Sequence, residues 1–166
     1  MSEELLKFYA DVDAAAKRLA DVHADRLKCA KGCSSCCVDG ITVFEIEADN
    51  IKARHADLLS EGAPHPEGAC AFLDSEGACR IYENRPYVCR TQGLPLRWIE
   101  EEAKTFDEYR DICPLNDIPD EPLEDLPENE CWTIGDFEGR LATLQISRSN
   151  GEPKRVHLRT LFKRKA

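Results

Sequence analysis

The nine cysteines of this chain are the residues whose type and spacing point most directly to chemistry. They are not scattered along the sequence. A first knot holds Cys29, Cys33, Cys36 and Cys37, a second holds Cys70, Cys79 and Cys89, and Cys113 and Cys131 follow singly. Because thiols rarely form stable disulfides in a reducing cytoplasm, such a dense set indicates metal binding or catalysis.

The first knot, residues 29–37, has the spacing of a thiolate metal site. Gaps of two to four residues allow neighbouring thiolates to turn toward one ion, at Zn–S distances of about 2.3 Å. Gly32 supplies conformational freedom where the chain must double back. The adjacent Cys36 and Cys37 point in different directions, so one of them can serve a second ion, bridge two ions or stay free.

The second knot brings three thiolates together by local geometry. Two short runs flank the turn-forming residues 74–77, and this pattern is typical of a β-hairpin over residues 70–82 that places Cys70 near Cys79. Residues 83–90 read as a short helix with a proline in its first turn, which returns Cys89 toward the hairpin. A fourth ligand must then come from another part of the chain.

The rest of the pattern predicts the elements that position these knots. An apolar stripe predicts a helix over residues 3–27, and a capping box at Thr42 predicts another over 43–59. A second capping box at Thr105 predicts a short helix, and Asp136 begins a last one. We therefore expect a mainly α, small α+β fold: an irregular cysteine-rich domain with several helices, one short β-hairpin and metal-organised loops.

The length of 166 residues suits a single domain, residues 1–166, with a modest core. Within it we expect a metal-binding core at residues 29–115, an acidic, proline-rich connection at 116–130, and a C-terminal helix and basic tail at 136–166. The plain interpretation of the tail is that it folds back on the acidic body. Binding of an anionic ligand is the alternative.

Composition limits the partners that the chain can have. Its 22 Lys and Arg residues against 32 Asp and Glu give a formal net charge of −10, which argues against nucleic-acid binding. No run approaches the ~18 apolar residues of a membrane span. The acidic start also lacks the basic and apolar regions of a signal peptide. We therefore expect a cytoplasmic protein without membrane contact, and leave a protein partner open.

The cysteine pattern resembles the bacterial YkgJ-like cysteine-cluster family, described as a zinc- or iron-chelating domain. The resemblance rests on the first knot, on Cys70-Ala-Phe-Leu and on Cys79-Arg-Ile-Tyr-Glu-Asn-Arg-Pro-Tyr-Val-Cys89-Arg, and covers about residues 29–115. It implies metal binding, with Cys113 as the later cysteine of the pattern and Cys131 outside it. The expected metal ligands are Cys29, Cys33, Cys36, Cys37, Cys70, Cys79, Cys89 and Cys113.

Three functions are compatible with these ligands. In the first, eight thiolates close two four-cysteine zinc sites whose metal is mainly structural. In the second, the thiolates hold an iron–sulfur cluster in a redox protein or enzyme. The spacing Cys29-x3-Cys33-x2-Cys36 matches radical S-adenosylmethionine enzymes, but it follows a predicted helix rather than a barrel strand. In the third, the Cys36–Cys37 pair or a free Cys131 serves thiol or metal-handling chemistry. Thiolate spacing accommodates zinc and iron–sulfur clusters alike, with zinc slightly preferred.

Overall fold

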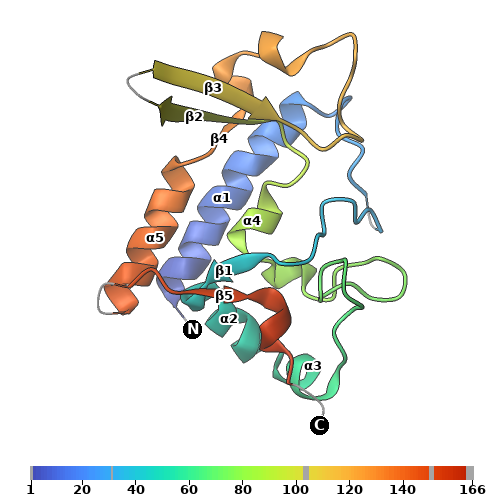
Figure 1. Cartoon of the computed structure of the whole chain (residues 1–166), viewed down its shortest axis with the longest axis vertical. Helices are drawn as coiled ribbons and strands as arrows, with labels where there is room; N and C mark the ends of the chain where they lie inside the picture. The colour runs from blue at the N-terminus through green and yellow to red at the C-terminus, as the bar shows by residue number, and fades with distance from the viewer. Residues whose placement is uncertain (1, 31, 103–104, 150–151, 164–166) are drawn as a thin grey trace.

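The computed structural model describes residues 2–30, 32–102, 105–149 and 152–163, and Figure 1 labels their elements. The helices are α1 (Glu3–Val22), α2 (Glu45–Arg54), α3 (Ala56–Glu61), α4 (Tyr87–Arg90) and α5 (Asp136–Arg148). The strands are β1 (Thr42–Phe44), β2 (Leu96–Glu102), β3 (Thr105–Asp111), β4 (Trp132–Thr133) and β5 (Arg155–His157). Short 3-10 helices are η1 (Tyr82–Asn84), η2 (Leu123–Asp125), η3 (Glu128–Glu130) and η4 (Leu158–Leu161). Helices outweigh strands and the sheets are small, as expected for the mainly α, small α+β class.

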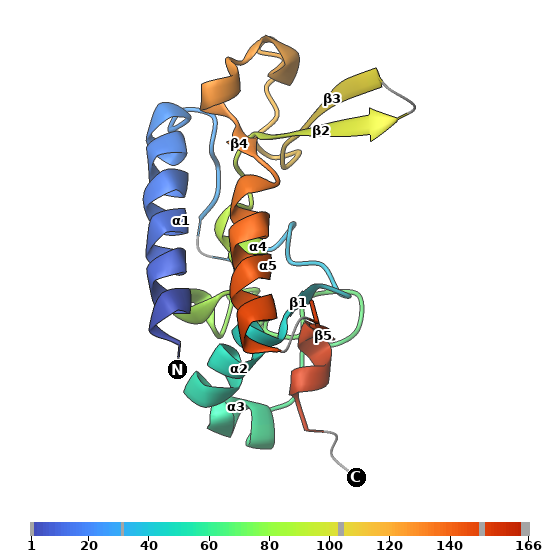
Figure 2. The same ribbon diagram turned by 90° about the vertical axis from the view of Figure 1, so that its left-hand side faces the viewer.

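Helix α1 forms where the apolar stripe predicts it, although it ends before the boundary expected from residues 3–27. The side chain of Ser2 caps it by accepting a hydrogen bond from the Leu5 N–H. Phe8 and Val12 lie on its buried face, and α1 packs along α5, as Figure 2 shows. Neither α1 nor any other helix in the described part of the chain is long and apolar enough to cross a membrane.

Aromatic side chains fill the space between α1, α4, α5 and β4. Trp132 stacks on Phe137 with ring centroids 4.8 Å apart, and Tyr87 stacks on Phe137 at 6.4 Å. Phe8 of α1 approaches Tyr87 at 5.7 Å. Such rings bury large apolar areas and dominate the energetics of a core. We call α1, α5 and β4, together with this cluster, the helical half.

A second apolar cluster lies beneath the cysteine-rich loops. It includes Ile51 of α2, Phe72 of the second knot and Leu158 of η4, each at most 3% exposed. Strand β1 pairs antiparallel with β5, which carries the C-terminal segment across to this cluster. We call residues 32–86 and 155–163 the cysteine half, and α4 joins the two halves.

The helix predicted over residues 43–59 is wrong in its first turn and is broken near its end. Its first residues form β1, because β5 supplies a pairing partner from the far end of the chain. The Glu47 carboxylate accepts a hydrogen bond from the Phe44 N–H at 3.3 Å, so the cap lies two residues later than expected. His55 separates α2 from α3, and its Nε2 lies 2.9 Å from the Asn84 Oδ1.

Strands β2 and β3 form a hairpin where the capping pattern predicts a helix, so that prediction is wrong. The strands pair along their whole lengths, and the Trp98 ring stacks on Tyr109 at 5.7 Å. The seven paired positions of the two strands, together with this cross-strand contact, favour the hairpin over the helix that the capping pattern predicts. The hairpin expected at residues 70–82 is reduced to one bridge, between Leu73 and Cys79.

The described part of the basic tail folds back on the acidic body, in agreement with its plain interpretation. Lys154 Nζ lies 2.6 Å from a carboxylate oxygen of Glu45, and Arg159 forms an ion pair with Asp39. Residues 164–166 lie outside the part of the chain that the structure describes.

Candidate metal centre

The two cysteine knots lie against each other although about thirty residues separate them in the sequence. The Cys70 N–H donates a hydrogen bond to the Cys37 carbonyl oxygen at 2.8 Å. At the turn of the second knot, a Cβ added to Gly77 would lie 3.3 Å from the carbonyl oxygen of Gly32. All nine cysteines carry free thiols. The fold thus brings unpaired sulfur atoms from distant segments into one region.

Five thiols affect one another's pKa and form a group that we call the inner thiols: Cys36, Cys37, Cys70, Cys79 and Cys89. The pKa of Cys89 is raised to about 12, first by burial and then by the neighbouring charges of Cys70 and Cys79. Burial likewise raises the pKa of Cys79, and Cys70 raises it further. These charge effects act among Cys70, Cys79 and Cys89, the three thiols of the second knot.

Cys36 and Cys37 differ sharply in acidity because their side chains share a hydrogen bond. The Cys37 thiol donates to the Cys36 sulfur and lowers the pKa of Cys36 to about 6. The same bond, together with burial and the charges of Cys70 and Cys89, raises the pKa of Cys37. Cys36 is therefore the thiol of this pair that ionises near neutral pH, and a thiolate is the form that binds metal.

Three other cysteines, Cys29, Cys33 and Cys113, form a second group that we call the outer trio. Ser35 connects two of its members, with Oγ 3.9 Å from Cys33 Sγ and 3.6 Å from Cys113 Sγ. Cys29 is held in the same region by Asn116, three residues after Cys113, whose Nδ2 lies 3.5 Å from Cys29 Sγ.

Two residues that hold Cys29 in place were not identified from the sequence. Asn116 is only 1% exposed, and its amide accepts from the Lys28 N–H and donates to the Gly93 carbonyl oxygen. A Cβ at Gly93 would lie 2.5 Å from Cys29 Sγ, and the φ of +91° also favours glycine. The spacing Cys113-x-x-Asn116 gives no local signal of this role, since the contact of Asn116 with Cys29 joins segments about ninety residues apart.

Buried polar contacts fix α4, which carries Cys89. Glu47 is 3% exposed, and its carboxylate accepts a hydrogen bond from the Tyr87 N–H, the first residue of α4, at 2.7 Å. Burial raises the pKa of Glu47. At the other end of α4, Arg90 Nη1 lies 2.6 Å from the Asp13 carboxylate of α1. The helix is thus tied at both ends, and the position of Cys89 with it.

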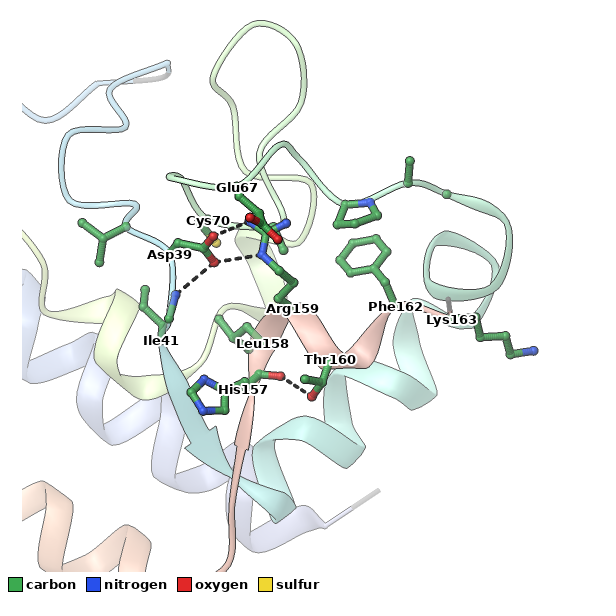
Figure 3. Close-up of a pocket in the computed structure, with 16 residues that line it drawn as sticks. Asp39, Ile41, Glu67, Cys70, His157, Leu158, Arg159, Thr160, Phe162 and Lys163 are labelled. Atoms are coloured by element: carbon green, nitrogen blue, oxygen red, sulfur yellow. Dashed lines mark hydrogen bonds and ion pairs between the residues drawn. The ribbon is translucent and has the colours of Figure 1, made fainter. Parts of the chain in front are cut away.

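An arginine clamp fastens the C-terminal segment to the loop before Cys70 (Figure 3). Arg159 donates two hydrogen bonds to the Asp39 carboxylate, at 2.9 and 2.8 Å, and these lower the pKa of Asp39 to about 2. The same guanidinium donates to the carbonyl oxygens of His65 and Ala69. An open hollow of about 950 Å³ lies beside the clamp, and Cys70 is among the residues that line it.

The donor chemistry of the inner thiols fits a thiophilic metal ion. In the part of the chain that the structure describes, no three Cys, His, Asp or Glu side chains form a ready-made coordination sphere. The thiols are nevertheless close enough to raise one another's pKa. A bound cation reverses that repulsion, because it stabilises the thiolates and displaces their protons.

Cys131 lies apart from both groups. Its side chain is buried at the base of the β2–β3 hairpin, where Arg110 Nη1 approaches Cys131 Sγ at 4.0 Å. Burial raises the pKa of Cys131. This position agrees with its place outside the matched cysteine pattern.

Comparison with known proteins finds one family. The model of the CxxCxxCC family, described as "Putative zinc- or iron-chelating domain", matches residues 28–114. No curated protein and no solved structure matches the chain. The matched segment contains both knots and Cys113, and it ends before Cys131.

Proposed function

The chain belongs to the CxxCxxCC, or YkgJ-like, family of zinc- or iron-chelating domains, and from this premise we propose that two sets of four thiolates hold mainly structural metal ions. The first set is Cys37, Cys70, Cys79 and Cys89. The second set is Cys36 together with the outer trio. The two neighbours in the first knot are thus divided between the two sites.

The observation that carries this proposal is the unequal grouping of the thiols. The inner thiols number five, one more than a tetrahedral site takes, and the outer trio has one fewer. Assigning Cys36 to the outer trio gives four ligands to each ion. Cys36 is suited to this role because it follows Ser35, whose hydroxyl lies near Cys33 and Cys113, and because its pKa is lowered.

Nearby cations support thiolates in the first set. Arg80 and Arg85 both lower the pKa of Cys79, opposing the effect of burial. Arg159 does the same for Cys70. Four thiolates around a divalent ion leave a net charge of −2, so positive neighbours stabilise the complete site.

A site closed by four thiolates has no open position for a substrate, and its contribution is to stability. The ligands come from both knots, α4 and the segment after β3, so bound ions would cross-link elements that few regular hydrogen bonds join. In small domains structural zinc contributes roughly 10–16 kcal/mol at neutral pH, comparable to the whole stability of a domain.

We propose zinc as the ion and the cytoplasm as the location, where thiols stay reduced and available. An iron–sulfur cluster is the alternative for either set. The radical S-adenosylmethionine class of enzymes is disfavoured, because in those enzymes the cysteine triplet follows a strand of a barrel. Here residues 29–36 follow α1, and the strands of the described chain form two small sheets.

Metal analysis tests the proposal. The full chain is purified without oxygen and without added metal, and zinc, iron and acid-labile sulfide are measured per chain. We expect a colourless protein with about two zinc ions, one for each set of four thiolates. A brown protein with stoichiometric iron and sulfide would identify the iron–sulfur alternative. A folded, metal-free protein with titratable thiols would overturn both.

A further inference from the structure

The β2–β3 hairpin extends away from both halves of the molecule (Figure 2). Its sheet has the order β3-β2-β4, and β4 pairs only with Leu96 and Arg97 at the base of β2. Beyond these two residues β2 and β3 pair with each other. No element of the described chain pairs with the outer edge of β3. An edge strand of this kind presents backbone N–H and C=O groups that can pair with another chain.

The hairpin also exposes apolar side chains that the fold does not use. Phe106 is 71% exposed, Ile99 55% and Tyr109 45%. Tyr109 stacks on Trp98 across the strands with an interplanar angle of 19°, which keeps the two rings together on one face. Phe106 and Ile99 lie on the opposite face, because side chains alternate along a strand. Each face of the hairpin thus exposes apolar side chains that a partner could cover.

The charge of the hairpin indicates which partner fits it. The two strands carry six acidic residues and two arginines: Glu100, Glu101, Glu102, Asp107, Glu108 and Asp111 against Arg97 and Arg110. Both arginines are engaged at the base. Arg97 pairs with Glu108 at 2.7 Å, and Arg110 donates to the carbonyl oxygens of Leu123 and Leu126. The outer part of the hairpin is therefore negative and complementary to a cationic partner.

We propose that this hairpin is the docking arm for an extended, lysine- or arginine-rich segment of a partner protein. The segment adds a strand at the free edge of β3, where main-chain hydrogen bonds supply affinity. Its cationic side chains on one face meet the Asp107 carboxylate and the stacked ring of Tyr109. Its residues on the other face cover Phe106. The inference does not depend on the metal or on the proposed function.

The test uses the full chain as purified and a peptide of alternating lysine and threonine, with an alternating glutamate–threonine peptide as its charge-inverted control. Binding is followed by calorimetry and by backbone amide shifts in the nuclear magnetic resonance spectrum. We expect the lysine peptide alone to bind, with the largest shifts over residues 105–109 and weaker binding at high salt.

Charge reversal at two sites separates a specific arm from general attraction to an acidic protein. The double variant Glu100→Lys, Asp107→Lys should weaken binding by about tenfold or more. These residues face each other across the strands, so the repulsion between them is equal in both forms. Glu100→Lys also removes a hydrogen bond from the Trp98 indole, so the amide spectrum of the variant must first show that the hairpin is retained. The matched variant Asp57→Lys, Glu61→Lys on exposed α3 should change binding by less than about twofold.

Three outcomes would overturn the docking arm. One is an equal loss of binding in both double variants, which would mean attraction to net charge alone. Another is amide shifts that fall mainly outside β2 and β3. The last is self-association of the hairpin variant with unchanged peptide affinity, which would mean that the acidic residues only keep the edge from pairing with copies of itself.

Discussion

The helical half is built from long regular elements, whereas the cysteine half consists largely of irregular loops around one apolar cluster (Figure 1). In the helical half, α1 and α5 enclose stacked aromatic rings. In the cysteine half, single contacts such as the Asp39–Arg159 clamp tie loops to a two-stranded sheet of three residues a strand. Packing of regular elements holds the first arrangement, whereas the second has fewer regular hydrogen bonds, and the proposed metal ions would cross-link its loops.

This difference suggests why thiols collect where they do. Loops cost conformational entropy on folding, and in the cysteine half one apolar cluster offsets part of that cost. A metal ion bound by thiolates from several loops would offset more of this entropy cost, because its binding free energy adds to the free energy of folding. The two halves should therefore respond differently to loss of metal, loss of a ligand, loss of an aromatic ring and loss of the clamp.

Metal removal should have the largest effect. Treating the reduced protein with a strong chelator removes roughly 10–16 kcal/mol of binding free energy, and the cysteine half should lose its structure. Hydrogen exchange followed by mass spectrometry should show faster exchange across residues 32–86, while α1 and α5 keep most of their protection. An equal loss of exchange protection in both halves would contradict the expected difference between them, and so would unchanged protection in both.

Loss of one metal ligand should have the second-largest effect. Cys89→Ser should release about one of the two ions, because serine does not replace a thiolate ligand of zinc. The matched variant Cys131→Ser should keep both ions. Elemental analysis and native mass spectrometry give the metal content of each chain. Full metal in Cys89→Ser, or loss from Cys131→Ser, would show that the ligands are assigned wrongly.

Truncation of a ring in the helical half should destabilise the protein without releasing metal. Phe8 is 2% exposed, so Phe8→Ala should cost about 3–5 kcal/mol of unfolding free energy in chemical denaturation. Phe106→Ala on the exposed hairpin should change it by less than about 0.5 kcal/mol. A folded Phe8→Ala protein that has lost its zinc would mean that the halves are not energetically separate.

Weakening the clamp should have the smallest effect. Arg159→Lys keeps the charge but loses the two-pronged contact with Asp39, at a cost of about 1–2 kcal/mol. Arg148→Lys, at an exposed ion pair with Asp49, should cost about 0–0.5 kcal/mol. Urea midpoints of the two variants measure the difference, and equal midpoints would mean that the two-pronged contact adds nothing to stability.

The same clamp has a defined pH dependence. The pKa of Asp39 falls from 3.8 to about 2 in the folded chain, so the carboxylate is stabilised by folding. Its contribution is present above pH 3.8 and is lost as the pH falls from there through about 2. An Asp39→Asn variant should therefore differ from the parent in stability at neutral pH and converge with it at the acid limit.

Local patterns were sufficient for some elements and misleading for others. The stripe through Phe8 and Val12 identified α1, because a long amphipathic period has no other regular solution. The capping pattern at Thr105 did not produce a helix, because β2 offers Trp98 as a partner for Tyr109. Strand β1 was missed for the same kind of reason, since its partner β5 lies more than a hundred residues away.

By itself the sequence determined the chemistry: free thiols at metal-ligand spacing, in a chain whose family match ends before Cys131. Only the tertiary structure decided which distant segments meet, with the Cys70 N–H on the Cys37 carbonyl oxygen, Ser35 beside Cys113, and Asn116 and Gly93 against Cys29. The physical reason is the distance along the sequence over which each property is set. Ligand type and spacing are properties of neighbouring residues, whereas the approach of one sulfur to another depends on the path that packing imposes on the chain.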